Sequence, residues 1–366
     1  MESSTRRFLG AAAVVVLMTG VAGAWIALRI GGARVTLWVD DGLTPLAALL
    51  ACVLCSRARA GQRGRMRLFW SLLAAATALW TLAEVIWGYY ALILNVEPPA
   101  VSWADVGYLS AIPVAVAALV AHPATGGRGA RKARSVLDGL VVATALLFLS
   151  WTLVLGSLWR SADLSTWGGV VALAYPFGDV VIVFFIVLAI RGMTGAGRAS
   201  LWCLLAALLV MALSDSTYTY LVEVGRYTSG DPIDVGWIAA YLGIALAAFS
   251  ARPGGALAPA AVSLAERSRP SLASLIAPLL PVLLALGAAA MEIRLGHRPD
   301  RAGWLIAFGL IALVLARQGL MVLELLAGGR DAQAGLMQRL TRAAFGEVGV
   351  EDERGSGYEA GAHEPV

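Results

Sequence analysis

Residues 167–191 read WGGVVALAYPFGDVVIVFFIVLAIR, with a single acidic residue, Asp179, and no basic residue before Arg191. An α-helix of about 20 mostly apolar residues is long enough to cross the hydrocarbon core of a bilayer. The stretch therefore predicts a transmembrane helix that carries a carboxyl group near its middle. Charged groups at that depth are costly, and those that occur there usually serve a function.

Similar apolar stretches fill most of the 366-residue chain. Apolar residues make up 59% of the sequence and charged residues 14%, with a mean hydropathy of +0.76. Ordinary soluble domains contain roughly 45–50% apolar and about 25% charged residues, so this composition excludes a soluble enzyme, a disordered protein and a nucleic-acid-binding protein. We expect an all-α, polytopic transmembrane helix bundle over residues 1–330, with about ten spans at 8–30, 37–56, 68–94, 103–122, 136–159, 167–191, 200–222, 233–251, 271–295 and 302–327.

The distribution of arginine predicts how the bundle is oriented, because basic residues concentrate in the cytoplasmic loops of membrane proteins. The loop at 57–67 contains five arginines, and the loop at 123–135 contains three arginines and one lysine. The loop between them, 95–102, contains no basic residue, although loops 29–36 and 294–301 run against the pattern with two and three arginines. We expect a plasma-membrane protein with both termini in the cytoplasm.

Two segments of the sequence repeat each other. Residues 105–111, DVGYLSA, and residues 234–240, DVGWIAA, are identical at four of seven positions. In the preceding spans, Glu84 and Asp215 stand at nearly the same offset from these segments. The third and fourth spans and the seventh and eighth spans are therefore predicted to be two parallel copies of one degenerate helical hairpin. Inverted repeats are the commoner signature of transporters, although parallel repeats also occur.

An acidic residue followed three positions later by an aromatic residue occurs twice in each hairpin. Positions i and i+3 share one face of a helix, so each acid and its ring can point together into the bundle. With Asp179, these residues predict a pocket in the outer half of the membrane that binds a small or cationic ligand, a lipid headgroup or an ion. The candidate ligand-binding residues are Glu84, Trp87, Asp105, Tyr108, Asp179, Asp215, Tyr218, Asp234 and Trp237.

The same residues also have structural interpretations. Asp105 and Asp234 stand at the starts of their spans, where aspartate is a favourable N-cap and interacts well with the helix dipole. Glu84, Asp179 and Asp215 lie within their spans, where a carboxyl group can be protonated or hydrogen-bonded to Ser, Thr or Arg. Aromatic residues on this side can form an interfacial belt, and those outside the candidate set are Tyr89, Tyr90, Trp103, Tyr175, Tyr220 and Tyr227.

Known catalytic motifs are absent from the sequence. It contains no H-E-x-x-H, G-x-S-x-G or P-loop motif. Its three histidines, His122, His297 and His363, are far apart in the chain. The acids are scattered along the helices without the paired Glu-x-x-His of di-metal bundles. We therefore expect a non-catalytic protein with no cofactor and no metal ion.

The C-terminal region predicts an output segment. Apolar residues recur at helical spacing over residues 331–349, which indicates an amphipathic helix on the cytoplasmic side. Such a helix can lie on lipid headgroups, dimerise or dock onto a partner. Residues 350–366 are Gly-rich and acidic and are expected to be disordered. The candidate output residues are Arg317, Leu336, Leu340 and Phe345.

Five motifs carry a resemblance to a known family. They are Trp80–Tyr90 with the run from Pro98 to Leu109, Leu137-Asp138-Gly139, Tyr175-Pro176-Phe177-Gly178-Asp179, Asp234-Val235-Gly236-Trp237 through Pro253, and Arg317-Gln318. In this order and spacing they resemble the N-terminal multi-span membrane region of actinobacterial GGDEF and GGDEF–EAL proteins, which make and degrade cyclic di-GMP. The resemblance covers roughly residues 65–330, and the Arg-, Ala- and Gly-rich composition fits an actinobacterial source.

The resemblance implies a sensory or regulatory membrane module. No GGDEF or EAL motif occurs in the sequence, so we do not expect the family's enzyme activity. Output would then need a partner, either a second copy in a homodimer or a separate cytoplasmic signalling protein. The lipid bilayer is the other expected partner.

We expect an integral membrane protein that detects a ligand or membrane state from its outer half and signals through its C-terminal helix. One alternative is a small-solute or proton-coupled transporter, in which Glu84, Asp179 and Asp215 would titrate. Another is a scaffold or assembly factor of a membrane complex. A transporter needs polar groups on both sides of the membrane midplane, whereas the inner halves of the hairpin spans are almost wholly apolar. The pattern therefore favours sensing or scaffolding.

Overall fold

The structure is a computed structural model that describes residues 2–96, 98–99, 101–126, 130–156, 159, 167–192, 198–251, 279–296 and 300–346. These residues form helices joined by short connections, and none of them is in a strand. The chain divides into two compact units, residues 1–314 and residues 315–366. The predicted all-α class is confirmed.

Most described helices are long enough to cross a membrane. Their bounds are α1 Glu2–Leu28, α2 Ala33–Ala60, α3 Gly64–Gly88, α4 Trp103–Ala121, α5 Ala130–Ser150, α7 Trp167–Gly192, α8 Arg198–Glu223, α9 Val235–Phe249, α11 Leu280–Arg294 and α12 Arg301–Gly346. Short π-helical segments η1 (Tyr89–Leu94) and η3 (Trp151–Leu155) follow α3 and α5, and 3-10 turns η2 (Pro123–Gly126) and η4 (Pro232–Asp234) follow α4 and precede α9. Eight helices in the described ranges combine sufficient length and apolarity, against about ten predicted spans, and the chain is an integral membrane protein.

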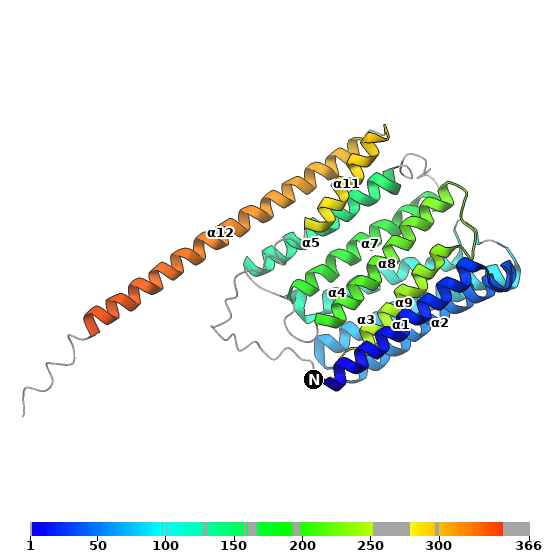
Figure 1. The fold of residues 1–366 in the computed structure, drawn as a ribbon, viewed down its shortest axis with the longest axis horizontal. Helices are drawn as coiled ribbons and strands as arrows, with labels where there is room; N and C mark the ends of the chain where they lie inside the picture. The colour runs from blue at the N-terminus through cyan, green and yellow to red at the C-terminus, as the bar shows by residue number, and fades with distance from the viewer. Residues whose placement is uncertain are drawn as a thin grey trace, which may run out of the picture. The chain divides into compact units, whose positions relative to one another are not determined.

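Within unit 1–314, the helices run roughly parallel to one another (Figure 1), and the contacts among six of the described helices close a ring. Around this ring α2 packs against α3, α3 against α4, α4 against α7, α7 against α8, α8 against α9, and α9 against α2. Outside the ring, α1 packs against α9, α5 against α7, and α11 against α5. The ring consists of two triplets, α2–α3–α4 and α7–α8–α9, and exchanging the triplets leaves its contact pattern unchanged. The two predicted hairpin copies are α3–α4 and α8–α9.

The two ends of the ring differ in charge. Ring helices that follow one another directly in the chain are antiparallel, so the N-termini of α2, α4, α7 and α9 meet the C-termini of α3 and α8 at one end. We call this the acidic end, because acidic residues from these helices gather there. The arginines of residues 57–67 lie at the opposite, basic end.

Toward the basic end, the interior of the ring is packed with apolar side chains. Leu73 of α3, Leu119 of α4, Ile186 of α7 and Leu204 of α8 are each at most 2% exposed and belong to one core cluster. Buried alanines of α2 and α9 complete this cluster, and small residues let membrane helices approach closely.

Glycines at the same position of both hairpin copies bring their helices together. A Cβ atom on Gly107 of α4 would lie 2.8 Å from Ala83 Cβ of α3 and 3.0 Å from the carbonyl oxygen of Leu79. A Cβ atom on Gly236 of α9 would collide with Ser214 Oγ of α8. The repeated Asp-Val-Gly sequence therefore sets the spacing within each hairpin.

The second helix is longer than predicted. The sequence predicts a span at 37–56 that opens on Asp40 and Asp41, whereas α2 begins at Ala33. Both acidic side chains are buried, because they lie inside the ring rather than at a loop.

The segment predicted as a cytoplasmic amphipathic helix at 331–349 belongs, as far as residue 346, to the longer helix α12. Helix α12 continues from Arg301 to Gly346 without a break. Gly328 and Gly329 lower helix propensity by about 1 kcal/mol each, but no proline interrupts the stretch. Residues 347–349, the predicted disordered tail at 350–366 and residues 271–278 of the predicted ninth span lie outside the described residues.

The glycine contacts predict that Gly107→Ala destabilises the bundle. The added methyl group meets a backbone carbonyl that cannot rotate away, and overpacking of this kind typically costs about 1–3 kcal/mol. The matched control is Gly20→Ala in α1, where a Cβ atom would have nothing within 4 Å. Thermal unfolding of the purified protein should show a lower midpoint for Gly107→Ala and an unchanged or higher midpoint for Gly20→Ala. Equal midpoints for the two variants would contradict the close approach.

Candidate functional site

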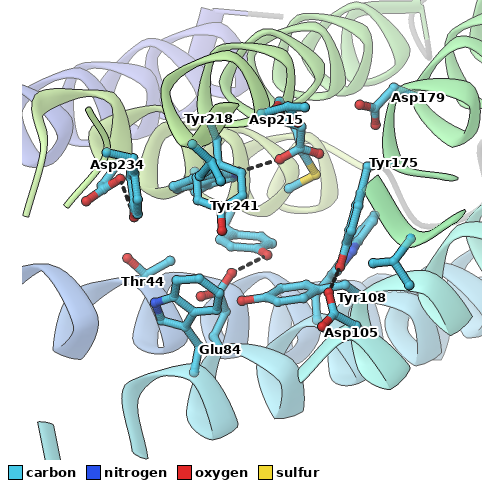
Figure 2. Close-up of a pocket in the computed structure, with 18 of the residues that line it drawn as sticks. Thr44, Glu84, Asp105, Tyr108, Tyr175, Asp179, Asp215, Tyr218, Asp234 and Tyr241 are labelled. Carbon is cyan, nitrogen blue, oxygen red and sulfur yellow. Dashed lines mark hydrogen bonds between the residues drawn. The ribbon is translucent and has the colours of Figure 1, made fainter. Parts of the chain in front are cut away.

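A cavity of about 280 Å³ lies inside the ring at its acidic end (Figure 2). Small-molecule sites typically have volumes of roughly 300–1,000 Å³, so this cavity suits a small ligand. All six ring helices, with the connection between α8 and α9, contribute to its wall. Seven carboxyl groups line it, those of Asp40, Asp41, Glu84, Asp105, Asp179, Asp215 and Asp234.

The nine residues predicted to bind a ligand all line this one cavity. Eight come from the two hairpin copies, and Asp179 comes from α7. The structure therefore brings together side chains that are up to 153 positions apart, from Glu84 to Trp237. Their binding of a ligand stays a prediction.

Several lining residues were not predicted from the sequence. Asp40, Asp41 and Thr44 of α2 line the cavity, as do Tyr175 of α7 and Tyr241 of α9. Two adjacent acids in an otherwise apolar stretch could have indicated that α2 lines the cavity. From the sequence, however, they were assigned to the start of a span. Tyr241 follows Asp234 by two helical turns and so shares its face, a spacing that could also have been noticed.

Asp105 and Asp234 each stabilise the start of a helix. Ser102 is the N-cap of α4, and its backbone N–H donates to Asp105 Oδ2 at 2.6 Å in a capping box. Asp231 caps η4 in the same way, with its backbone N–H donating to Asp234 Oδ2 at 3.0 Å. Ser102 and Asp231 are thus the N-caps of α4 and η4, with Asp105 and Asp234 as their partners at the third helical position, and Asp234 also stands at the N-cap position of α9.

The second oxygens of these two carboxyl groups are also bonded. The Tyr175 hydroxyl donates to Asp105 Oδ1 at 2.5 Å, and the Tyr227 hydroxyl donates to Asp234 Oδ1 at 3.1 Å. Burial raises the pKa of the Tyr227 phenol, and the neighbouring Asp234 carboxyl raises it further, so Tyr227 remains a donor. Asp105 and Asp234 thus have both oxygens engaged in equivalent bonds in the two hairpin copies.

Glu84 and Asp215 are held by aromatic residues of neighbouring helices. The indole N–H of Trp237 in α9 donates to Asp215 Oδ1 of α8 at 2.6 Å. The Tyr241 hydroxyl donates to Glu84 Oε1 of α3 at 2.8 Å, and Tyr108 of α4 points toward the same carboxyl group (Figure 2). Each acid and the ring three positions later on its own helix both line the cavity, whereas the hydrogen bonds to Glu84 and Asp215 come from another helix.

Aromatic rings form much of the wall between the acids. Tyr218 packs edge to face with Trp87, Trp237 and Tyr227, at ring-centroid distances of 6.2, 5.6 and 4.7 Å. Such rings have electron-rich faces that attract cations within about 6 Å. The aromatic lining residues are Trp80, Trp87, Tyr108, Tyr175, Tyr218, Tyr227, Trp237 and Tyr241.

Three carboxyl groups keep an oxygen with no hydrogen-bond partner. The backbone N–H of Gly230 is shared between Asp40 Oδ2 at 3.1 Å and Asp234 Oδ2 at 2.9 Å. The other oxygen of Asp40, Oδ1, is buried without a partner, as are Asp41 Oδ2 and Asp179 Oδ2. Asp40 and Asp41 are only 3% and 8% exposed. Buried polar atoms are normally paired, so a proton or a donor group of a ligand is needed to satisfy these oxygens.

The charged side chains among the described residues that line the cavity are all acidic. None of its described lining residues is Lys, Arg or His, against seven carboxyl groups. Burying an unpaired charge in an apolar environment is costly, so the carboxyl groups must be neutralised by protons or by a cation. Among the described residues, no group of three or more His, Cys, Asp or Glu side chains is arranged to hold a metal ion. The arrangement is chemically suited to an organic cation.

Other candidate residues lie elsewhere. Tyr89, Trp103 and Tyr220 are 51%, 73% and 47% exposed and are not among the lining residues, as expected for an interfacial belt. The candidate output residues belong to α12 in the second unit, and they are Arg317, Leu336, Leu340 and Phe345.

Comparisons with protein-family models, curated proteins and solved structures found no match to the chain. The resemblance to the membrane region of GGDEF proteins therefore stays a prediction. The case for function rests on the cavity itself.

The bonding pattern predicts opposite effects of acid-to-amide substitution at two kinds of site. Asp105→Asn should destabilise the protein by about 0.5–2 kcal/mol, because an amide offers one acceptor and places a donor nitrogen against donors of the helix cap. Asp41→Asn should leave stability unchanged or raise it, since it removes a buried carboxyl oxygen with no partner. Thermal unfolding midpoints measure both effects. Equal losses would assign Asp41 a purely structural role.

Proposed function

We propose that the chain is a membrane sensor or regulatory module that binds a small ligand in the ring cavity. The observation that carries the proposal is the set of buried carboxyl oxygens without partners on Asp40, Asp41 and Asp179, in a cavity to which all six ring helices contribute. A ligand bound there touches every helix of the ring. Its binding energy can therefore bias the packing of the whole unit.

The packing of the ring favours sensing over transport. A transporter requires a polar path that continues past its binding site. The acidic residues of the cavity are the one feature that would suit a proton-coupled transporter. Beyond the cavity, however, Leu73, Leu119, Ile186 and Leu204 fill the ring interior. A proton-coupled or small-solute transporter is accordingly the second candidate function. The third is a scaffold whose function does not involve the cavity.

Orientation follows from the arginine distribution. The five arginines of residues 57–67 lie at the end of the ring opposite the cavity. If basic loops face the cytoplasm, the cavity opens toward the outer side of the plasma membrane and both termini are cytoplasmic. A ligand would then reach the cavity from outside the cell.

Output would pass through α12. This helix contains the candidate span Arg301–Leu323 and continues to Gly346. The part beyond residue 323 is long enough to dock onto a second copy or onto a cytoplasmic signalling protein, which would supply the activity that the chain itself lacks motifs for. The resemblance to membrane regions of cyclic-di-GMP enzymes supports this division of roles.

The proposal predicts that a deletion of residues 328–366 abolishes partner capture. Cross-linking in the native membrane followed by purification should recover a signalling protein with the full chain and lose it with the deletion. The deletion removes no cavity-lining residue, so the protein should still insert and unfold at the same temperature.

A substitution outside the ring, Glu292→Gln in α11, serves as the control and should capture the same partner as the unaltered chain. Partners that are retained by the deletion would favour the scaffold. Loss of solute uptake in vesicles upon cavity substitution, with capture unaffected by the deletion, would favour the transporter.

A further inference from the structure

The unpartnered carboxyl oxygens are not spread evenly around the cavity. Asp40 and Asp41 lie on α2, and Asp179 lies on α7. In the ring, α2 and α7 are separated on one side by α3 and α4 and on the other by α8 and α9. The two helices are therefore opposite each other, and the cavity has an anionic pole at each.

Figure 2 shows the same separation in the close-up. Thr44, one turn after Asp40 and Asp41 on α2, lies near Asp234 at one side, and Asp179 lies at the other. The rings of Tyr241, Tyr218 and Tyr108 lie between them. Figure 2 thus agrees with the order of helices around the ring.

The remaining acids already accept hydrogen bonds from the protein, although Asp234 lies beside Asp40 and Asp215 lies near Asp179. Asp105 and Asp234 have both oxygens bonded within the capping boxes and to tyrosines. Glu84 and Asp215 each accept a hydrogen bond from an aromatic side chain. Only the poles on α2 and α7 present buried oxygens without a partner among the described lining residues.

The wall between the poles fits an apolar connector. Met211, Ile182 and Trp80 line the cavity together with the tyrosines. Methylene groups pack well against such surfaces, and the faces of the rings attract positive charge. A rigid metal ion would satisfy one pole only, and no described group of acids is arranged to hold one.

We propose that the cavity binds a linear organic polycation, a diamine or polyamine whose two ammonium groups are held by Asp40 and Asp41 at one end and by Asp179 at the other. This inference rests on the proposed function, because it names the chemical class of the ligand that the sensor detects. Each ammonium group carries three donors, which is enough for the two unpartnered oxygens on α2 or the one on α7. The methylene chain spans the aromatic wall. The two anionic poles set the preferred length of the ligand.

The test is a binding series on the full chain in lipid nanodiscs, measured by isothermal titration calorimetry. The probes are α,ω-diaminoalkanes of three to eight carbons, with n-alkylamines, diols and dicarboxylates of the same lengths. Affinity for diamines should pass through a maximum at one length, because the poles are fixed. At that length the diamine should bind at least about tenfold more tightly than the monoamine, because the second ammonium adds a buried charge pair.

Two variants locate the poles. Asp41→Asn and Asp179→Asn should each lower the affinity for the best diamine by about tenfold or more and remove the length preference. Each variant should affect the monoamine less than the diamine, since a monoamine uses one pole. Glu292→Gln on α11 should leave all affinities unchanged. Thermal unfolding of the ligand-free variants checks that they fold.

The proposal is overturned if diamines bind no more tightly than monoamines, or if a diol or dicarboxylate binds in their place. It is also overturned if both substitutions weaken monoamine and diamine binding equally. The deletion of residues 328–366 separates the two levels of the argument. If that deletion keeps diamine binding and loses partner capture, both proposals stand. If diamines bind but the partner protein is still captured after the deletion, the proposed ligand class stands and the proposed sensor function is rejected.

Discussion

A carboxyl group among apolar helices must find a hydrogen-bond donor, a proton or a cation, and this requirement organises the acidic end of the ring. Asp105 and Asp234 meet it with helix caps and tyrosine hydroxyls. Glu84 and Asp215 meet it with side chains of α9. The bonds from Tyr175 to Asp105, from Tyr241 to Glu84 and from Trp237 to Asp215 each join two helices, so they also hold the ring together around the cavity.

The two hairpin copies show how one arrangement serves both structure and binding. Equivalent aspartates at residues 105 and 234 keep the same capping role, and equivalent glycines at 107 and 236 keep the same close approach. The first members of the triplets, α2 and α7, carry acids at positions that no cap uses. The repeated hairpins form the frame of the cavity, while α2 and α7 supply the carboxyl oxygens that have no partner in the protein.

Part of this could be predicted from the sequence. Apolar length predicts the helices, and a charge within an apolar stretch predicts Glu84, Asp179 and Asp215 as special, because burial of charge is rarely accidental. Closure of the ring could not be predicted, because it depends on α9 packing against α2. The hydrogen bond from Gly230, in the connection before α9, to Asp40 of α2 likewise joins residues 190 positions apart. Without that contact, Asp40 and Asp41 look like the start of a span. Pairing between helices likewise depends on side chains whose neighbours only the tertiary structure defines.

The ring has no free edge, and this has a mechanical consequence. In an open row of helices, an outer helix can tilt without disturbing the rest. In a closed hoop, a displacement of any helix changes the spacing to both neighbours, and the close contact at Gly107 leaves little slack to absorb it. A displacement of one helix therefore shifts its neighbours in both directions around the hoop, as far as the helix on the opposite side. Such a geometry responds to small displacements as a unit rather than locally.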